Sequence, residues 1–525
     1  MIKVDNIKVR INYTDQDLRQ AICRTMKVKM DDLLSYEIMR RSLDARKKPD
    51  LFYVFSLHVE VKLEDKVLKK NKHLKKADLY TYRYPTCSPL EERPIIVGLG
   101  PAGLFAAHVF AKAGLRPLVF EMGEAVQERS QTVEHFWKTG QLNPKSNVQY
   151  GEGGAGTFSD GKLTTRSKDP RARKVLEVLV DHGGPQEIVY SHKPHVGTDI
   201  LKKVVVSMRN EIIDLGGEVH FSTQVEDLII DQGRIKGVKT SKGDFYSGCV
   251  LLGIGNSGRA MYEVLHRHGI DLEQKPFAMG LRIEHQQSMI DLNQYGSLEA
   301  RQYLGASDYK LTHKAANGRS VYSFCVCPGG MVVASASEED GLVVNGMSEY
   351  KRDQENINSA LLVQVQTEDF GSDHPLAGMY YQRKYEHKAF KLTQNFRGPV
   401  QTVAGFLNDR LDELGHISPS YRPGVSLAML KECLPDFASR ALKEALVAFG
   451  KKIKGFDQDD SVLTGLESRS SAPVRIVRDR ESLESTSLGG LYPIGEGAGY
   501  AGGIVSAAID GMRAAEAAIE AYGKR

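Results

Sequence analysis

Alternating apolar and polar positions at the start of the chain predict a small module of strands and one helix. Residues 3–12 and 51–63 alternate with a period of two, which is typical of half-buried strands. Residues 15–26 follow a helical pattern with acidic residues in the first turn. We therefore expect an α+β module over residues 1–90.

A short apolar run then leads directly into a glycine pattern. Gly98, Gly100 and Gly103 are followed by an alanine-rich helix, and the next apolar run ends in Glu121. This is the dinucleotide-binding fingerprint: Gly98 permits the tight turn, Gly100 lets a diphosphate approach the backbone, and Gly103 brings helix and strand together. The helix N-terminus attracts phosphates, and the Glu121 carboxylate suits ribose hydroxyls but repels a 2′-phosphate.

Further along, the pattern predicts an amphipathic helix at residues 199–215 and then a series of strands. The strand-like runs are separated by turns and span residues 218–222, 225–230, 234–240 and 244–252. A helical, alanine-rich pattern returns at residues 505–522. Strands and helices in this order predict an α/β fold.

Glycine clusters mark two further loops. Five glycines within residues 151–161 exclude a regular helix or strand, so a loop beside a ligand is favoured over a flexible linker. Gly253, Gly255 and Gly258 repeat the fingerprint spacing, and a second nucleotide site for NAD(P)H is one interpretation. We favour the other, a strand end that passes beneath the first dinucleotide, because no later strand closes on an acidic residue.

These patterns divide the chain into three domains, which suits its 525 residues. The N-terminal module occupies residues 1–90, and the nucleotide-binding domain begins at 91–270 and is completed by 476–525. Residues 271–475 form an inserted α+β domain, which we expect to hold the substrate.

Composition and charge add little to this picture. The chain is 41% apolar and 26% charged, with a net charge of +4. Six lysines lie between Lys66 and Lys76; a solvated face is favoured, and a patch for a nucleic acid or an acidic partner is the alternative. We expect a cytoplasmic protein with no membrane partner, because the six cysteines are scattered and no signal peptide or long apolar span is evident.

The order of these elements resembles the FAD-binding domain of glutathione-reductase-type flavoproteins, with Gly495-Glu496-Gly497 as its last motif. More closely, the chain resembles the bacterial family of uncharacterised FAD-dependent dehydrogenases along nearly its whole length. The runs that match this family are residues 193–199, 280–285, 322–330 and 495–503. The resemblance implies a Rossmann-like FAD-binding domain of three layers (ββα), an inserted α+β substrate domain and a small N-terminal α+β module.

The resemblance also implies which residues hold FAD. Glu496, where the related flavoproteins usually have Asp, would bind the ribityl chain, and Gly502 and Gly503 would let the last helix face the pyrimidine side of the ring. That helix dipole favours the negative charge of the reduced flavin, although close packing of small residues is an alternative. Arg129 is assigned either to the adenosine half or to a structural salt bridge. The expected cofactor residues are Gly98, Gly100, Pro101, Ala102, Gly103, Glu121, Arg129, Gly153, Gly154, Gly156, Val225, Gly255, Gly495, Glu496, Gly502, Gly503 and Ile504.

Cys325, Cys327 and His285 are the candidates for catalysis. In an extended strand the two cysteines share a face with Cα atoms about 6.5 Å apart, near the upper limit for a disulfide. Buried structural thiols are favoured over a redox pair or flavin-facing thiol, and over half of a metal site. No further cysteine cluster completes a zinc site, although histidines could, and we expect no metal. His285 could transfer a proton, but a structural role is favoured.

Together these observations predict an FAD-dependent dehydrogenase that transfers a hydride between a small-molecule substrate and non-covalently bound FAD. NAD(P)H is a candidate transient electron donor. Two alternatives stay open: a flavoprotein that acts on RNA through the basic N-terminal module, and a non-catalytic flavin-binding protein.

Overall fold

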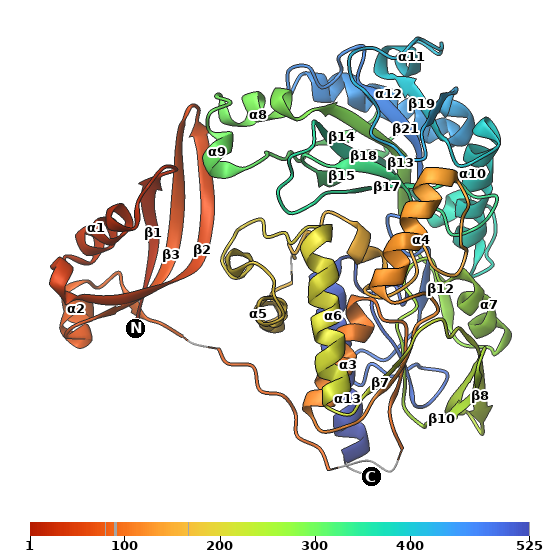
Figure 1. Ribbon diagram of the computed structural model, residues 1–525, viewed down its shortest axis with the longest axis horizontal. Coiled ribbons are helices and arrows are strands. Elements are labelled where there is room, and N and C mark those ends of the chain that lie inside the picture. Colours follow the sequence, from red (N-terminus) through yellow and green to blue (C-terminus); the bar gives the residue numbers. More distant parts are fainter. Residues whose placement is uncertain (79, 89–91, 166, 524–525) are drawn as a thin grey trace.

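The computed structural model describes residues 1–78, 80–88, 92–165 and 167–523, and three large sheets organise it (Figure 1). They have four, five and seven strands and follow one another along the chain, except that the last strand of the five-stranded sheet comes from near the C-terminus. The expected domain boundary at residues 90–91 lies outside the described residues. No helix within the described ranges is long and apolar enough to span a membrane.

The N-terminal module is a four-stranded sheet with one main helix packed on it. Helix α1 (Asp15–Met26) begins with a capping box in which Thr14 and Asp17 bond each other's backbone N–H groups. The alternation expected for the first and third strands is confirmed, whereas the long second strand was missed. The strands lie in the order β2 (Leu33–Lys47), β3 (Asp50–Val61), β1 (Ile2–Arg10) and β4 (Lys75–Lys76).

The five-stranded sheet is wholly parallel. Its order is β23 (Leu491–Pro493), β11 (Val250–Leu252), β5 (Ile95–Val97), β6 (Leu118–Phe120) and β7 (Glu218–His220). Side chains alternate across it: Ile95 and Val97 pack on one face, and Ile96 on the other. Both faces are therefore covered, as parallel sheets require.

Helices cover one face of this sheet and a small antiparallel sheet covers the other. The helices are α3 (Pro101–Lys112), α6 (Thr198–Asp214) and α13 (Ile504–Gly523), with α5 (Arg171–Asp181) beside them. The opposite face carries α7 (Arg259–Arg267), β8 (Val225–Asp231), β9 (Arg234–Thr240) and β10 (Gly243–Tyr246). The strand expected at 244–252 is corrected to two strands, β10 and β11, because the Ser247 hydroxyl accepts the N–H of Cys249 at a turn between the two sheets.

The seven-stranded sheet forms a separate part of the molecule, at the top right of Figure 1. Its centre is β13 (Phe277–Gln286), which pairs antiparallel with β18 (Asn356–Val365) and with β21 (Val462–Glu467). The chain enters this part through β12 (Leu272–Gln274) and leaves it through β22 (Val474–Ile476). Because β12 and β22 pair with each other, the two crossings lie side by side.

Candidate cofactor site

A cavity of about 560 Å³ follows the carboxyl edge of the parallel sheet. The loops after β5, β6, β11 and β23 all line it, because the carboxyl ends of parallel strands meet at one edge. The chain runs outward from β5 to β6 and β7 on one side, and β11 and β23 follow on the other. The cavity therefore lies at the switch point of the strand order, where open α/β sheets bind ligands.

The three fingerprint positions require glycine for different physical reasons. A Cβ on Gly98, which has φ +91°, would lie 2.4 Å from the carbonyl oxygen of Gly253, and one on Gly103 would lie 1.9 Å from that of Gly98. Those two positions are fixed by backbone packing. A Cβ on Gly100 would meet no protein atom closer than the Cα of Gly154 at 3.8 Å, so its missing side chain leaves room only for a ligand.

Glu121 ties the fingerprint loop to the second glycine-rich loop. Its Oε2 accepts the N–H of Leu99 at 2.8 Å, and its Oε1 accepts those of Gly123 and Gly151 at 3.0 Å each. The side chain is buried but still lines the cavity, as does the neighbouring Thr223, whose N–H donates to the backbone carbonyl oxygen of Glu121 at 3.0 Å. Its expected role at the ribose stays a prediction.

Arg129 requires a correction. Its guanidinium is fully buried and donates to the carbonyl oxygens of Asn147, Val148, Glu152 and Gly154 at 2.6–3.0 Å. All of these carbonyls belong to the loop before and within the glycine cluster. Arg129 therefore holds the shape of the loop that lines the cavity, and it does not line the cavity itself.

Most of the other expected cofactor residues do line the cavity. The exceptions are Gly103 and Gly153, whose absent side chains are explained by close packing against Gly98 and Thr157. Gly502, Gly503 and Ile504 bring the N-terminus of α13 to the cavity wall. The loop at 253–258 lines this same cavity, so it is a strand end beside the first fingerprint, and the NAD(P)H interpretation gains no support.

Glu496 presents its carboxyl group to the cavity. The side-chain amide of Asn256 donates to its Oε1 at 3.2 Å. Burial raises the pKa of Glu496 to about 7, because the charged form loses hydration that one amide does not replace. The group therefore has acceptor capacity left for the hydroxyl groups of a ligand.

The two cysteines lie on an irregular part of β15 (Ser320–Cys327) beside the cavity. The strand register shifts between Phe324 and Cys327, and Cys325 has φ +44°, so the ideal extended geometry that we expected is wrong. Cys325 lines the cavity, whereas Cys327 is fully buried behind it and its Sγ lies 3.2 Å from the carbonyl oxygen of Cys325. Only Cys325 can meet a ligand directly.

A buried arginine side chain stabilises the irregular part of β15. Arg282 on β13 donates to the carbonyl oxygen of Cys325 at 2.6 Å and approaches Cys327 Sγ at 3.4 Å, and it is paired with Glu467. Lys162, from the glycine-rich loop, donates to the carbonyl oxygen of Val326. The Cys327 thiol, and then the cations Arg282 and Lys162, hold the pKa of Cys325 below its ordinary value, so this thiol is poised to ionise.

The proposed proton-transfer role of His285 is also corrected. The ring is fully buried, its Nε2 lies 2.7 Å from the carbonyl oxygen of Phe456, and it packs against the Phe456 ring. It does not line the cavity. His285 is therefore a core residue of the seven-stranded part.

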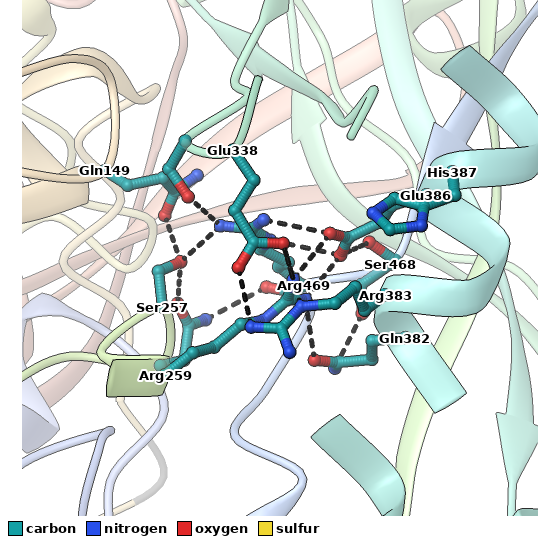
Figure 2. A network of polar contacts seen from close by, with 12 residues as sticks. Gln149, Ser257, Arg259, Glu338, Gln382, Arg383, Glu386, His387, Ser468 and Arg469 are labelled. Atoms are coloured by element: carbon teal, nitrogen blue, oxygen red, sulfur yellow. Dashed lines mark hydrogen bonds and ion pairs between the residues drawn. The ribbon is translucent and has the colours of Figure 1, made fainter. Parts of the chain in front are cut away.

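Where the two large parts of the molecule meet, an ionic network supports one wall of the cavity (Figure 2). Glu386, on α10 (Ala377–Thr393), is fully buried, and its carboxylate binds the guanidinium groups of Arg259 and Arg469 at 2.7–3.1 Å. Arg469 also donates to Ser257, and both of these residues line the cavity. The two arginines hold the pKa of Glu386 far below its ordinary value despite the burial.

A protein of Clostridium beijerinckii, described as uncharacterized, is 47% identical in an alignment that covers 99% of this chain and 99% of that one. Residues 276–470 match the family described as FAD-dependent protein, C-terminal domain-like. The chain belongs to the same family as the Clostridium protein. Residues 1–60 of the chain described here match a domain of unknown function, and this range covers β1 to β3.

Solved structures are less similar to this chain than the Clostridium protein is. Glycine oxidase from Bacillus cereus is 11% identical, with a TM-score of 0.33 over 82% of this chain and 96% of that one. Glycerol-3-phosphate dehydrogenase from Bacillus halodurans, complexed with FAD, is 12% identical, with a TM-score of 0.36 over 82% and 65%.

The sequence analysis did not predict several residues that line the cavity. Glu467 and Arg469 are close neighbours in the sequence but lie far along the chain from Lys162, and none of the three belongs to a recognised motif. Lys162 directly follows the last glycine of its loop, and that position was the one available signal.

Proposed function

We propose that the protein is an FAD-dependent dehydrogenase with a glutathione-reductase-type cofactor site. The observation that carries this proposal is one continuous cavity that joins the fingerprint loop, Glu496 and the N-terminus of α13. These three features come from opposite ends of the chain and meet at the switch point of the parallel sheet. An elongated cofactor needs such a site, because its phosphates, sugar and ring are held at different places.

The donors and acceptors along the cavity suit the parts of FAD. The free N–H groups at the start of α3 and the side-chain-free Gly100 suit the diphosphate. Glu121 suits the ribose and Glu496 the ribityl hydroxyls, since both offer carboxylate oxygens to the cavity. The ring then lies in the part of the cavity that Gly502, Gly503, Cys325 and Lys162 line.

When bound there, FAD supplies a ring that accepts a hydride and later gives it up. The N-terminus of α13 favours negative charge at the adjacent ring edge, as helix N-termini do. Cys325 offers a thiol of lowered pKa in this part of the cavity, and Arg282 fixes the backbone that carries it. The proposed substrate binds beside the ring, against the seven-stranded sheet that carries Cys325 on β15.

Anaerobic reduction tests the proposed activity. The flavin-loaded protein is mixed with candidate small-molecule reductants, including NADH and NADPH, and bleaching of the visible flavin band is followed. We expect a subset of donors to bleach it within the time of enzymatic turnover. A loaded protein that no donor reduces would instead favour the non-catalytic alternative, and salt-sensitive RNA binding through the exposed lysines 66–76 would favour the RNA alternative.

Thiol labelling tests the position of Cys325. At neutral pH we expect iodoacetamide to modify Cys325 in the flavin-free protein, because the thiol is accessible and its pKa is lowered. Bound FAD should slow this modification by about ten-fold or more, since the ring covers the wall. Cys87, which is partly exposed outside the cavity, serves as the control whose labelling FAD leaves unchanged. Equal rates at Cys325 with and without FAD would contradict the placement of the ring.

The raised pKa of Glu496 predicts a pH-dependent stability. Burial raises its pKa from 4.5 to about 7, so the group stabilises the flavin-free protein most at low pH, and this contribution is lost as the pH rises through about 7. Replacing Glu496 with glutamine should flatten the fall of the melting temperature between about pH 5 and pH 8. Identical pH profiles for the parent and E496Q would show that Glu496 is not the titrating group.

A further inference from the structure

We propose that His108, His182 and Glu211 bind a divalent transition-metal ion on the outer side of the helical layer. His108 lies on α3, His182 directly follows α5, and Glu211 lies on α6. One ligand atom from each residue lies within 4.8 Å of the other two. None of the three lines the cofactor cavity, so this site is independent of the proposed flavin chemistry.

The distances between the ligand atoms are close to those in a tetrahedral site. The Nε2 atoms of His108 and His182 lie 2.8 Å and 3.1 Å from the same carboxylate oxygen, Oε2 of Glu211. Ligands placed 2.0–2.1 Å from a tetrahedral zinc ion are about 3.3 Å apart. Small movements of the side chains would therefore admit the ion, and the backbone could stay in place.

The hydrogen-bond partners of His182 suit the orientation of a metal ligand. Its Nδ1 lies 2.7 Å from the carbonyl oxygen of Val178, and its Nε2 lies 3.1 Å from the Glu211 carboxylate. A neutral imidazole has one N–H and one lone pair, so it cannot satisfy two oxygen acceptors. With Nδ1–H donated to Val178, the Nε2 lone pair faces Glu211 and is available to a cation between these two atoms, whereas without an ion the ring must carry both protons to donate to both oxygens. A histidine ligand held by a backbone carbonyl in this way is the common arrangement in metal sites.

The surroundings of Glu211 define how the ion would be held. Lys112 occupies the other carboxylate oxygen, Oε1, at 2.5 Å, so Glu211 is left with Oε2 for a metal ion. The hydroxyl of Tyr84 lies 3.5 Å from Nδ1 of His108, and this contact can orient that ring as well. Two imidazoles and one carboxylate favour zinc or a similar first-row ion over calcium or magnesium, which prefer oxygen ligands throughout. Three protein ligands leave one position open to water.

Such an ion would join three helices and the segment that leads from the N-terminal module. Tyr84 packs edge-on against the His108 ring, and the neighbouring Tyr82 donates to Glu516 on α13 at 2.6 Å. The ion would therefore fasten this segment to the helical layer, far from the carboxyl edge of the sheet. We assign it a stabilising role.

Calorimetric titration with Zn²⁺ alone tests the site in the full-length, chelator-stripped protein. We expect one equivalent to bind with a dissociation constant below about 10 µM, and H182A to weaken it by about 50-fold or more. The matched control is H268A, because His268 also contacts a carboxylate, Asp227 at 2.6 Å, but belongs to no three-ligand group that the described residues form. No binding, or binding that H182A leaves unchanged, would overturn the proposal.

Thermal melting provides a second readout that does not depend on activity. Zn²⁺ should raise the melting temperature of the parent and of H268A but leave that of H182A unchanged, because only an ion bound to the folded state stabilises it. His182 is the preferred target because it lies near the surface, whereas His108 is almost fully buried and its loss could prevent folding. Equal shifts in all three proteins would indicate adventitious binding and would contradict the site.

Discussion

Replacing Gly100 with alanine is expected to weaken FAD binding by at least about 100-fold, or about 2.7 kcal/mol, while the chain still folds. The added methyl group meets no protein atom within 3.8 Å, and the backbone there has an ordinary φ of −74°. It projects instead into the space that the diphosphate needs. Alanine at this N-cap position should cost the helix only about 1 kcal/mol.

Two further glycine variants make this prediction specific. G341A adds a methyl group at a buried position outside the cavity, with its nearest contacts at 3.6 Å, and should retain FAD. G103A forces a methyl group to 1.9 Å from the Gly98 carbonyl oxygen and should lose stability and FAD together. Flavin fluorescence titration and thermal melting separate the two effects. A folded G100A protein that binds FAD as tightly as G341A would show that the diphosphate lies elsewhere.

Replacing Glu386 with glutamine should destabilise the folded protein by about 3–5 kcal/mol, because two buried guanidinium groups lose their shared counter-charge. Arg259 and Arg469 are both at least nine-tenths buried, and Glu386 contacts both of them. Glu338 bonds Arg259 from the other side, but it cannot replace a carboxylate that is fully enclosed between the two arginines. The network in Figure 2 joins the two large parts of the molecule, so their packing should weaken as well.

Denaturant unfolding measures this loss, and E263Q provides a matched control. Glu263 is half exposed and lies 3.8 Å from Arg383, so its replacement should change the free energy of unfolding by less than about 1 kcal/mol. If E386Q and E263Q had equal stability, the buried network would not hold the two parts together.

The fold around the cofactor site could be predicted because its signals are local. The signals lie within a short stretch of sequence: the strand before Gly98, the helix after it, and Glu121 at the end of the next strand. Each of them follows from the local structure of the backbone. The same holds for the helix after Gly503. Periodicity also separated the strands between residues 218 and 240, but it did not detect the break at Ser247, where an apolar run passes from one sheet to another.

Contacts between distant segments could not be predicted in this way. Arg129 has the same sequence context whether it binds a ligand or four backbone carbonyls, and only the loop geometry decides. Glu386 and the His108–His182–Glu211 group depend on helices that are separate in the sequence and pack together only in the folded chain. The expectation of no metal relied on cysteine spacing, which does not detect such a group.

A crystal structure of the protein with FAD would test the central claim most directly. We expect the diphosphate at the N-terminus of α3 beside Gly100, the ribityl chain at Glu496, and the ring between Cys325 and the N-terminus of α13. Electron density for FAD outside this cavity, or with the ring at the Glu121 end, would contradict the account.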